Sequence, residues 1–274
     1  MNKIKNFVAV HKNAPLYGDD SYQFVHVGAE RNPIVIEGAV RDNEYEDNIS
    51  VKNNIYCELT GYYHIWKHIK EVDFVGFCHY RRFFAKKRFS YHPNNVILSA
   101  SEMQELLKDH DIILAVPSSK RGPRHGCFPT QPEIEEFFPY RVMMPVIKEL
   151  YPDYVDEFNR EFFLETMSFC NMFVTSKKLF DEYCQFLFDI LFEVEENLRM
   201  KNIGGVAPRE MGYFSEWLLN VWVRKNKLKV AYKPVIFISD KKGSHYFVKY
   251  ILQQLGLGKL TSHLENFIRN VKRL

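Results

Sequence analysis

A histidine, a tyrosine and two arginines stand side by side at positions 79 to 82, directly after an apolar run. The run, Phe74 to Cys78, is short, continuous and bounded by polar residues, which predicts a strand buried on both faces. In open α/β sheets, ligands bind just beyond the carboxyl ends of such strands. Because guanidinium groups bind phosphate oxygens bidentately, we expect an anionic ligand here, held by His79, Tyr80, Arg81 and Arg82. The alternative is an edge strand with a solvated basic tail.

A second dense group of polar residues lies between positions 47 and 60. Ser50 is expected to cap a helix that begins there, and a helix N-terminus favours anions. A lysine in the first helical turn opposes the helix dipole, so Lys52 is expected to pair with a ligand or a carboxylate. Capping accounts for Ser50 but not for the whole set. The binding candidates are Asp47, Asn48, Lys52, Asn53 and Glu58.

A third group is rich in basic residues and follows another apolar run. Residues 111–116 predict a buried strand, and the loop after it contains Lys120, Arg121, Arg124 and His125. If this strand is parallel to the strand at 74–78, both polar loops open onto the same edge of the sheet. They would then form a cationic cleft suited to a nucleotide diphosphate. The alternative is a surface loop without a site.

The elements that must position these residues alternate along the chain. Runs at 7–10, 22–27, 74–78, 111–116, 169–175 and 230–238 predict strands. Helices are expected from Ser50 to about residue 69, after a cap at Ser176, and over 214–224, with an irregular helical region at 131–165. This alternation predicts an α/β fold with a mainly parallel sheet flanked by helices. We expect one domain over residues 1–241 and a helical appendage over 242–274.

Composition narrows the functional classes. The net charge of +3 over 274 residues is too small to imply nucleic-acid binding by itself. No apolar run is long enough for a membrane-spanning helix. The five scattered cysteines form no C-x-x-C pair, which predicts a reducing cytoplasm rather than a disulfide scaffold. His64 and His68 have zinc-compatible spacing, but no third ligand accompanies them.

Several segments together resemble a known bacterial family. They are residues 47–60 (DNISVKNNIYCELT), Trp66-Lys67 and residues 75–84 (VGFCHYRRFF), together with His11-Lys12 and residues 25–28, 169–173 and 212–218. The family is that of capsule and exopolysaccharide glycosyltransferases catalogued as a domain of unknown function. The resemblance spans roughly residues 5 to 240, and motifs of this length are specific.

The resemblance implies a GT-A-like fold and transfer of a hexose from a UDP-sugar to a growing, lipid-linked surface polysaccharide. In some members the sugar is galactofuranose or galactose. Together with the residue patterns described above, the candidates for donor binding are His11, Lys12, Asp47, Asn48, Lys52, Asn53, Tyr80, Arg81, Arg82 and Arg209, and the candidates on the acceptor side are Asn171, Arg121 and Arg124. The basic loop within 117–140 departs from the family, which usually has a histidine-rich acidic stretch there, so the acceptor stays open.

The leaving diphosphate of such a donor must be stabilised. GT-A enzymes commonly do this with a divalent metal on an Asp-x-Asp motif, which this sequence lacks. Either arginines replace the metal electrostatically, or His79 with a carboxylate such as Asp47 ligates Mn²⁺ or Mg²⁺. The first alternative is favoured, and no tightly bound cofactor is expected.

Inverting transfer also needs a carboxylate base that deprotonates the acceptor hydroxyl. The candidates are Glu216, Glu58 and Glu210, with His79 as a further catalytic candidate. Glu216 stands near the start of a helix in an aromatic-rich segment, where the helix dipole alone could also favour it. Arg209 could pair with Glu216 or reach a phosphate.

The C-terminal segment adds a membrane hypothesis. Its basic and apolar residues predict an amphipathic helix that docks on the inner face of the plasma membrane, or else packs against its own domain or a partner. Two other functional classes stay open. One is a nucleotide-sugar-binding module without a base, and the other is an RNA-binding protein that uses basic loops and aromatic rings.

Overall fold

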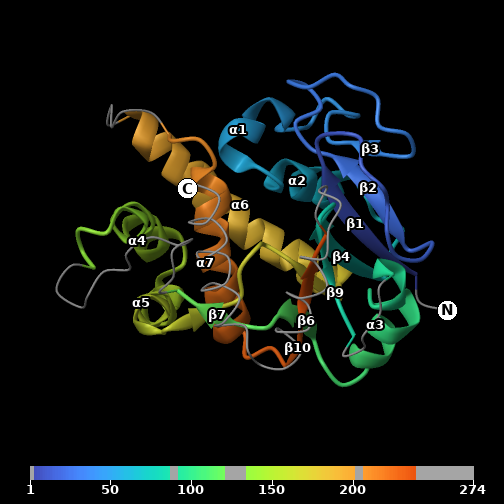
Figure 1. Cartoon of the computed structure of the whole chain (residues 1–274). Helices are drawn as coiled ribbons and strands as arrows, with labels where there is room; N and C mark the ends of the chain where they lie inside the picture. The colour runs from blue at the N-terminus through green and yellow to red at the C-terminus, as the bar shows by residue number, and fades with distance from the viewer. Residues whose placement is uncertain (1–2, 87–91, 121–133, 201–205, 239–274) are drawn as a thin grey trace, which may run out of the picture.

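The sheet at the centre of the molecule is mixed and mostly parallel. A computed structural model describes residues 3–86, 92–120, 134–200 and 206–238 (Figure 1). The main strand order is β10-β6-β9-β4-β1-β2-β3. These strands are β1 (Ile4–Val10), β2 (Tyr22–His26), β3 (Val40–Arg41), β4 (Phe74–His79), β6 (Ile112–Ala115), β9 (Phe173–Ser176) and β10 (Val230–Lys233).

Strand direction decides where the polar loops open. β1 is parallel to β2 and β4, whereas β9 is antiparallel to both β4 and β6. β4 and β6 therefore point the same way, and the loops after them open onto the same edge, as predicted. Two short strands, β5 (Arg82–Phe84) and β11 (Val235–Phe237), extend the sheet beside β4, and β7 (Ser118–Ser119) pairs separately with β8 (Thr166–Met167).

Both faces of the central strands are buried, which confirms the prediction from their continuous apolar runs. In β1, Phe7 and Ala9 belong to one core, while Val8 and Val10 belong to the other. β4 divides in the same way, with Phe77 on the first side and Cys78 on the second. Helices cover both sides, so the predicted α/β class is confirmed.

The helices are α1 (Asn53–Tyr56), α2 (Leu59–His68), α3 (Ala100–Leu106), α4 (Phe138–Leu150), α5 (Val155–Phe163), α6 (Lys177–Met200) and α7 (Glu210–Lys225). α3 lies on the opposite side of the sheet from α6 and α7 (Figure 1). The predicted cap of α6 is confirmed, because Ser176 Oγ accepts the amide of Leu179 at 3.3 Å. In the described part of the chain, no helix has the length and apolarity needed to cross a membrane.

The prediction of a continuous helix capped by Ser50 is wrong. Residues Ser50–Lys52 form a 3-10 turn (η1), and Ser50 Oγ donates instead to Asp42 Oδ1 at 2.5 Å. The chain then breaks between α1 and α2 at Cys57, whose φ is +52°. Because the Cys57 carbonyl accepts the side chain of Asn53 at 2.6 Å, this break is fixed locally.

Two predicted strands are also shorter than expected. The strand expected at 169–175 begins only at Phe173, because Cys170 (φ +81°) and Asn171 (φ +46°) have left-handed backbone. The run at 230–238 is divided into β10 and β11 at Pro234, which has no N–H to give to a ladder. The expected tail, residues 242–274, lies outside the described residues.

Candidate active site

Parallel strands end side by side where the polar segments follow. Ala9 of β1 lies opposite His79 of β4, and the amide of Tyr80 donates to the carbonyl of Ala9 at 3.1 Å. Beyond these ends, the rings of His11 and Tyr80 meet edge-on with centroids 5.4 Å apart. The predicted ligand-binding edge is thus built by the carboxyl ends of β1 and β4.

Two cations flank the ring of Tyr80. Lys12 Nζ lies 5.4 Å from the ring centroid, and Arg81 Cζ lies 5.3 Å from it. Burial, together with the charges of Lys12 and Arg81, lowers the pKa of His11. Its imidazole is therefore mostly neutral at pH 7. Four residues predicted to bind the donor, His11, Lys12, Tyr80 and Arg81, are thus adjacent in space.

Hydrogen bonds connect this edge of the sheet to α7. His79 Nε2 donates to the carbonyl of Cys170 at 2.7 Å, and the amide of Cys170 donates to Glu216 Oε1 at 2.7 Å. A single residue between them therefore holds the histidine at the end of β4 and the carboxylate on α7. The structure brings these two catalytic candidates into one group.

Glu58 joins this group through Asn171. Asn171 Nδ2 donates to Glu58 Oε1 at 2.8 Å and to the carbonyl of Gly212 at 2.9 Å. Asn171 is 1% exposed, and its Oδ1 is buried with no hydrogen-bond partner in the part of the chain described. The sequence placed Asn171 on the acceptor side, whereas here it orients the Glu58 carboxylate.

The backbone of this group is strained. Of the five non-glycine residues with positive φ in the described part of the chain, four belong here: Cys57, Cys170, Asn171 and Arg209. The amide of Arg209 donates to the carbonyl of Asn54 at 2.8 Å, which ties the start of α7 to α1. A left-handed non-glycine residue costs on the order of 1–3 kcal/mol and persists where surrounding contacts fix it, often at functional sites.

Glu216 is the most perturbed carboxyl group of the cluster. Burial raises its pKa to about 7, and the charge of Glu58 adds to that rise. The Cys170 amide and the charges of Arg82 and Arg209 act in the opposite direction. A carboxylate with a pKa near 7 is suited to accept a proton at neutral pH.

His79 is held as a neutral imidazole. Burial is the largest cause lowering its pKa, and the charges of Arg82 and Arg209 lower it further, against the opposing charge of Glu58. Arg82 also lies over the ring of Phe237, with Cζ 5.4 Å from its centroid. Arg209 is exposed at the N-terminus of α7. Both predicted arginines therefore place positive charge next to His79 and Glu216.

Two predicted donor-binding residues, Lys52 and Asp47, have partners within the protein. Lys52 Nζ forms an ion pair of 2.7 Å with Glu195 on α6. Lys52 was expected to pair with either a ligand or a carboxylate, and its partner in the structure is the carboxylate. Asp47 accepts the hydroxyl of Tyr63 at 2.7 Å, and its carbonyl lies 2.7 Å from His68 Nε2. These contacts do not bring Lys52 or Asp47 to His79. Lys52 and Tyr63 instead line an open groove of about 950 Å³ beside α6.

Asn48 and Glu210 also serve local structure. Asn48 Oδ1 accepts the amide of Ser50 at 3.0 Å, which closes a turn before η1. Glu210 Oε2 accepts the amide of Ala207 at 2.9 Å at the start of α7.

Among the residues that the structure describes, no group of three or more His, Cys, Asp and Glu side chains could hold a metal ion. The proposed pairing of His79 with Asp47 gains no support from their contacts.

Asn53, the first residue of α1, has its side chain next to Gly28, which lies just beyond the end of β2. Gly28 has a φ of +71°, and a Cβ there would lie 2.6 Å from the Asn53 side chain, so this approach requires glycine. Asp42, which was not predicted as a site residue, is fully buried and accepts the amides of Gly28 at 2.6 Å and Ala29 at 3.0 Å. No motif marks Asp42, because its partners, two backbone amides and the hydroxyl of Ser50, lie 8 to 14 residues away along the chain.

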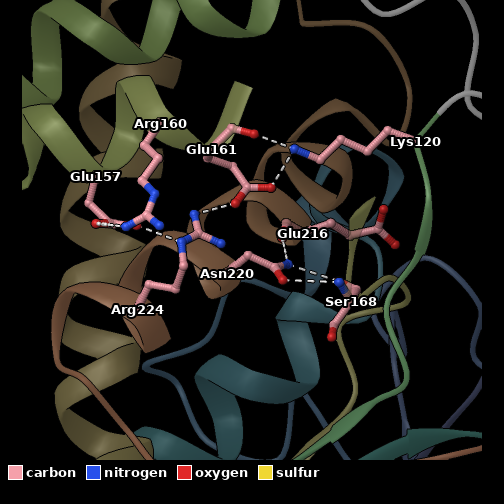
Figure 2. Close-up of polar contacts among 8 residues, drawn as sticks. All are labelled: Lys120, Glu157, Arg160, Glu161, Ser168, Glu216, Asn220 and Arg224. Carbon is pink, nitrogen blue, oxygen red and sulfur yellow. Dashed lines mark hydrogen bonds and ion pairs between the residues drawn. The ribbon is translucent and has the colours of Figure 1, made fainter. Parts of the chain in front are cut away.

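The predicted role of Lys120 in a cationic cleft is wrong. Lys120 is 2% exposed and pairs with Glu161 Oε1 at 2.6 Å, and Arg224 binds the other oxygen of Glu161 (Figure 2). Its charge is therefore neutralised inside the protein. Arg121 and Arg124, predicted on the acceptor side, lie outside the described residues.

Comparisons with known proteins agree with this fold. A family model described as a domain of unknown function, DUF4422, matches residues 5–227. Among solved structures, the chain is similar to the apo structure of WbbM, a bifunctional glycosyltransferase, with 28% sequence identity and a TM-score of 0.74. The similarity covers 87% of this chain and 46% of that chain, so this chain spans about half the length of WbbM. No curated protein matches. The likeness confirms the predicted GT-A-like α/β fold.

Proposed function

The chain belongs to the DUF4422 family, and from this premise we propose that it is a glycosyltransferase. It would move a hexose from a nucleotide-diphosphate sugar to a hydroxyl of a growing surface polysaccharide. The observation that carries the proposal is Glu216, a carboxylate with a pKa of about 7 tied to the end of β4 and flanked by Arg82 and Arg209. Similarity to a glycosyltransferase structure supports the same conclusion.

The chemistry requires a base and a cationic group on opposite sides of the anomeric carbon. In our proposal, the acceptor oxygen attacks the anomeric carbon while its proton passes to the Glu216 carboxylate. The bond from that carbon to the diphosphate oxygen breaks, and the electron pair leaves with the diphosphate. Because the acceptor attacks the face opposite the leaving diphosphate, this single displacement inverts the configuration at the anomeric carbon.

Arginines provide the charge that the leaving diphosphate needs. Arg82 and Arg209 both act electrostatically on Glu216 and His79, and in our proposal they hold the diphosphate on the side of the anomeric carbon opposite the base. Arg81 and Lys12, around the Tyr80 ring, would extend the cationic surface toward the nucleotide. Fixed charges in a water-poor site stabilise a developing anion without reorganisation. Donor turnover retained in excess EDTA would support this role, and full loss rescued by Mn²⁺ would contradict it.

The acceptor and its membrane context stay proposals. A lipid-linked glycan would place the reaction at the inner face of the plasma membrane, and the basic segment 242–274 would help the protein to dock there. Flotation of the full chain and of residues 1–241 with anionic liposomes would test this idea. Equal flotation of the two proteins would contradict it.

Glu216→Gln tests the central assignment, because glutamine keeps the size and can still accept the Cys170 amide. A thermal-shift screen over nucleotide sugars, with and without Mn²⁺, first identifies the donor. We expect Glu216→Gln to bind this donor nearly as tightly as the wild type and to lose transfer by about 10²-fold or more. Glu182→Gln, an exposed change on α6, is the matched control. Normal transfer by Glu216→Gln would exclude Glu216 as the base. Donor binding without turnover in the wild type would favour a nucleotide-sugar-binding module.

A further inference from the structure

Asn220 lies one helical turn after Glu216 on α7, and its side chain binds both the amide and the carbonyl of Ser168. Its Oδ1 accepts the amide of Ser168 at 3.0 Å, and its Nδ2 donates to the carbonyl of Ser168 at 2.9 Å (Figure 2). The same Nδ2 donates to the carbonyl of Glu216 at 2.8 Å. Asn220 is 7% exposed and Ser168 2%, so water cannot readily replace these bonds.

The loop of residues 168–171 is therefore attached to α7 at two points. Asn220 holds Ser168, and Glu216 holds the amide of Cys170, two residues further along. Ser168 Oγ donates to the carbonyl of Ala115 at 2.7 Å, which also anchors the loop to the end of β6. Four residues of a helix rise by about 6 Å, close to the span of two extended residues, so Asn220 and Glu216 can reach Ser168 and Cys170 at the same time.

This attachment matters because the loop adopts backbone conformations that its residues do not favour. Cys170 and Asn171 both have positive φ, although neither is glycine. Such a pair persists only where neighbouring contacts fix it. Without the contacts at Ser168, only the contacts of Cys170 and Asn171 would fix the loop, and the Cys170 amide would be held less firmly toward Glu216.

We propose that Asn220 is a positioning residue, which holds the 168–171 loop against α7 so that the Cys170 amide points at Glu216 and the Cys170 carbonyl at His79. Asn220 itself reaches neither substrate nor the reacting atoms. Its role in catalysis rests on the proposed function, whereas its role in orienting the loop does not.

The ionisation of Glu216 reports on this orientation. The Cys170 amide stabilises the charged carboxylate, as do Arg82 from β5 and Arg209 from the start of α7. Glu58, beside α2, opposes ionisation, and Tyr183 of α6 and Cys57 also lie close enough for Glu216 to raise the pKa of each. Loss of the amide contact alone would therefore move the titration of Glu216 upward.

The experiment follows the Glu216 carboxyl carbon by NMR in protein labelled with ¹³C at glutamate side chains, with Glu216→Gln assigning the signal. We expect Asn220→Ala to raise the titration midpoint by about one pH unit or more, because a hydrogen bond to a charged group is lost. Where transfer is measurable, its pH profile should shift in the same direction, with kcat falling by up to about 10²-fold and donor KM little changed.

Asn226→Ala is the matched control. Asn226 is the C-cap of α7 and likewise donates to a carbonyl four residues earlier, that of Trp222 at 2.8 Å, but it does not touch the loop. Its substitution should leave the midpoint unchanged. If Asn220→Ala fails to fold, Asn220→Gln can be used instead. It keeps the amide group but moves it by one methylene, so it should also raise the titration midpoint of Glu216. A folded variant with a wild-type midpoint would overturn the proposal. Absence of any transferase activity would count against the proposed function alone.

Discussion

The carboxylate of Glu216 accepts the amide of Cys170 at 2.7 Å, although Cys170 has left-handed backbone. The contact joins α7 to the loop before β9, and the carbonyl of Cys170 continues it to His79. A backbone amide cannot change its charge or rotamer, so it orients the carboxylate more rigidly than a side chain would. The strained backbone of Cys170 and the carboxylate of Glu216, whose pKa is raised, are therefore in direct contact.

The first prediction concerns the pH dependence of activity. If Glu216 is the base, only its ionised form can accept the acceptor proton. Because its pKa is raised to about 7, kcat/KM should rise as the pH increases through about 7 and level off above it. Initial rates across this range, at subsaturating donor, would measure the profile. A rate that is flat from about pH 5 to about pH 8 would contradict Glu216 as the base.

The second prediction concerns stability at Glu216. Its folded-state pKa lies above the value of about 4.3 in an unfolded chain, so the folded protein binds the proton more tightly. This contribution is fully present below about pH 4 and is lost as the pH rises through about 7, at a cost of about 4 kcal/mol. Glutamine never ionises, so the free energy of unfolding of Glu216→Gln should not fall in this way. Relative to the wild type, the variant should therefore be more stable at alkaline pH than at acid pH by about this amount.

Urea denaturation at about pH 5 and about pH 8.5 would measure the difference for wild type and Glu216→Gln. Glu182→Gln on the exposed face of α6 should leave the pH dependence unchanged. A stability difference between Glu216→Gln and wild type that is the same at both pH values would show that Glu216 ionises normally.

The third prediction concerns the buried ion pair at Lys120 (Figure 2). Glu161 is fully buried, and its two oxygens face Lys120 and Arg224. Lys120→Met removes one cation and leaves the carboxylate partly uncompensated, which should lower the free energy of unfolding by about 3 kcal/mol. Lys178→Met, which removes an exposed ion pair of 3.8 Å with Glu182, should cost less than about 1 kcal/mol. Chemical denaturation distinguishes the two, and equal losses would mean that burial does not strengthen the pair.

The sequence allowed the edge of the site to be predicted, because local patterns determine it. The apolar run of β4 followed by His79 to Arg82 is such a pattern, and so is Glu216 in an aromatic-rich helix. The sequence did not allow the left-handed backbone at Cys57 and Cys170 to be predicted, because cysteine has no preference for it and contacts from other elements impose it.

Long-range pairing is the other feature that the sequence does not reveal. Lys52 and Glu195 are 143 residues apart, and Asn171 and Glu58 are 113 apart. No spacing rule connects such residues before the chain folds. The sequence therefore left open whether Lys52 pairs with a ligand or a carboxylate, and its partner is Glu195. It also did not reveal that the side chain of Asn171, expected on the acceptor side, binds Glu58.

The last prediction separates strain from function at Arg209. Its φ of +68° at the start of α7 disfavours any side chain with a Cβ, and its guanidinium group is exposed beside the ring of Tyr213, 5.5 Å from the centroid. Glycine removes the strain, so Arg209→Gly should be about 1 kcal/mol more stable than Arg209→Ala. Both variants lose the charge proposed to face the diphosphate, so both should bind UDP at least about tenfold more weakly.

Calorimetry with UDP and urea denaturation would measure the two effects on the same proteins. Arg199→Ala is the matched control, because Arg199 is also exposed but pairs with Glu196 on α6 at 2.7 Å. Wild-type affinity for UDP in both Arg209 variants would remove Arg209 from the donor site. An Arg209→Gly variant that is more stable yet binds UDP weakly would mean that strain is retained at this position because the arginine is needed there.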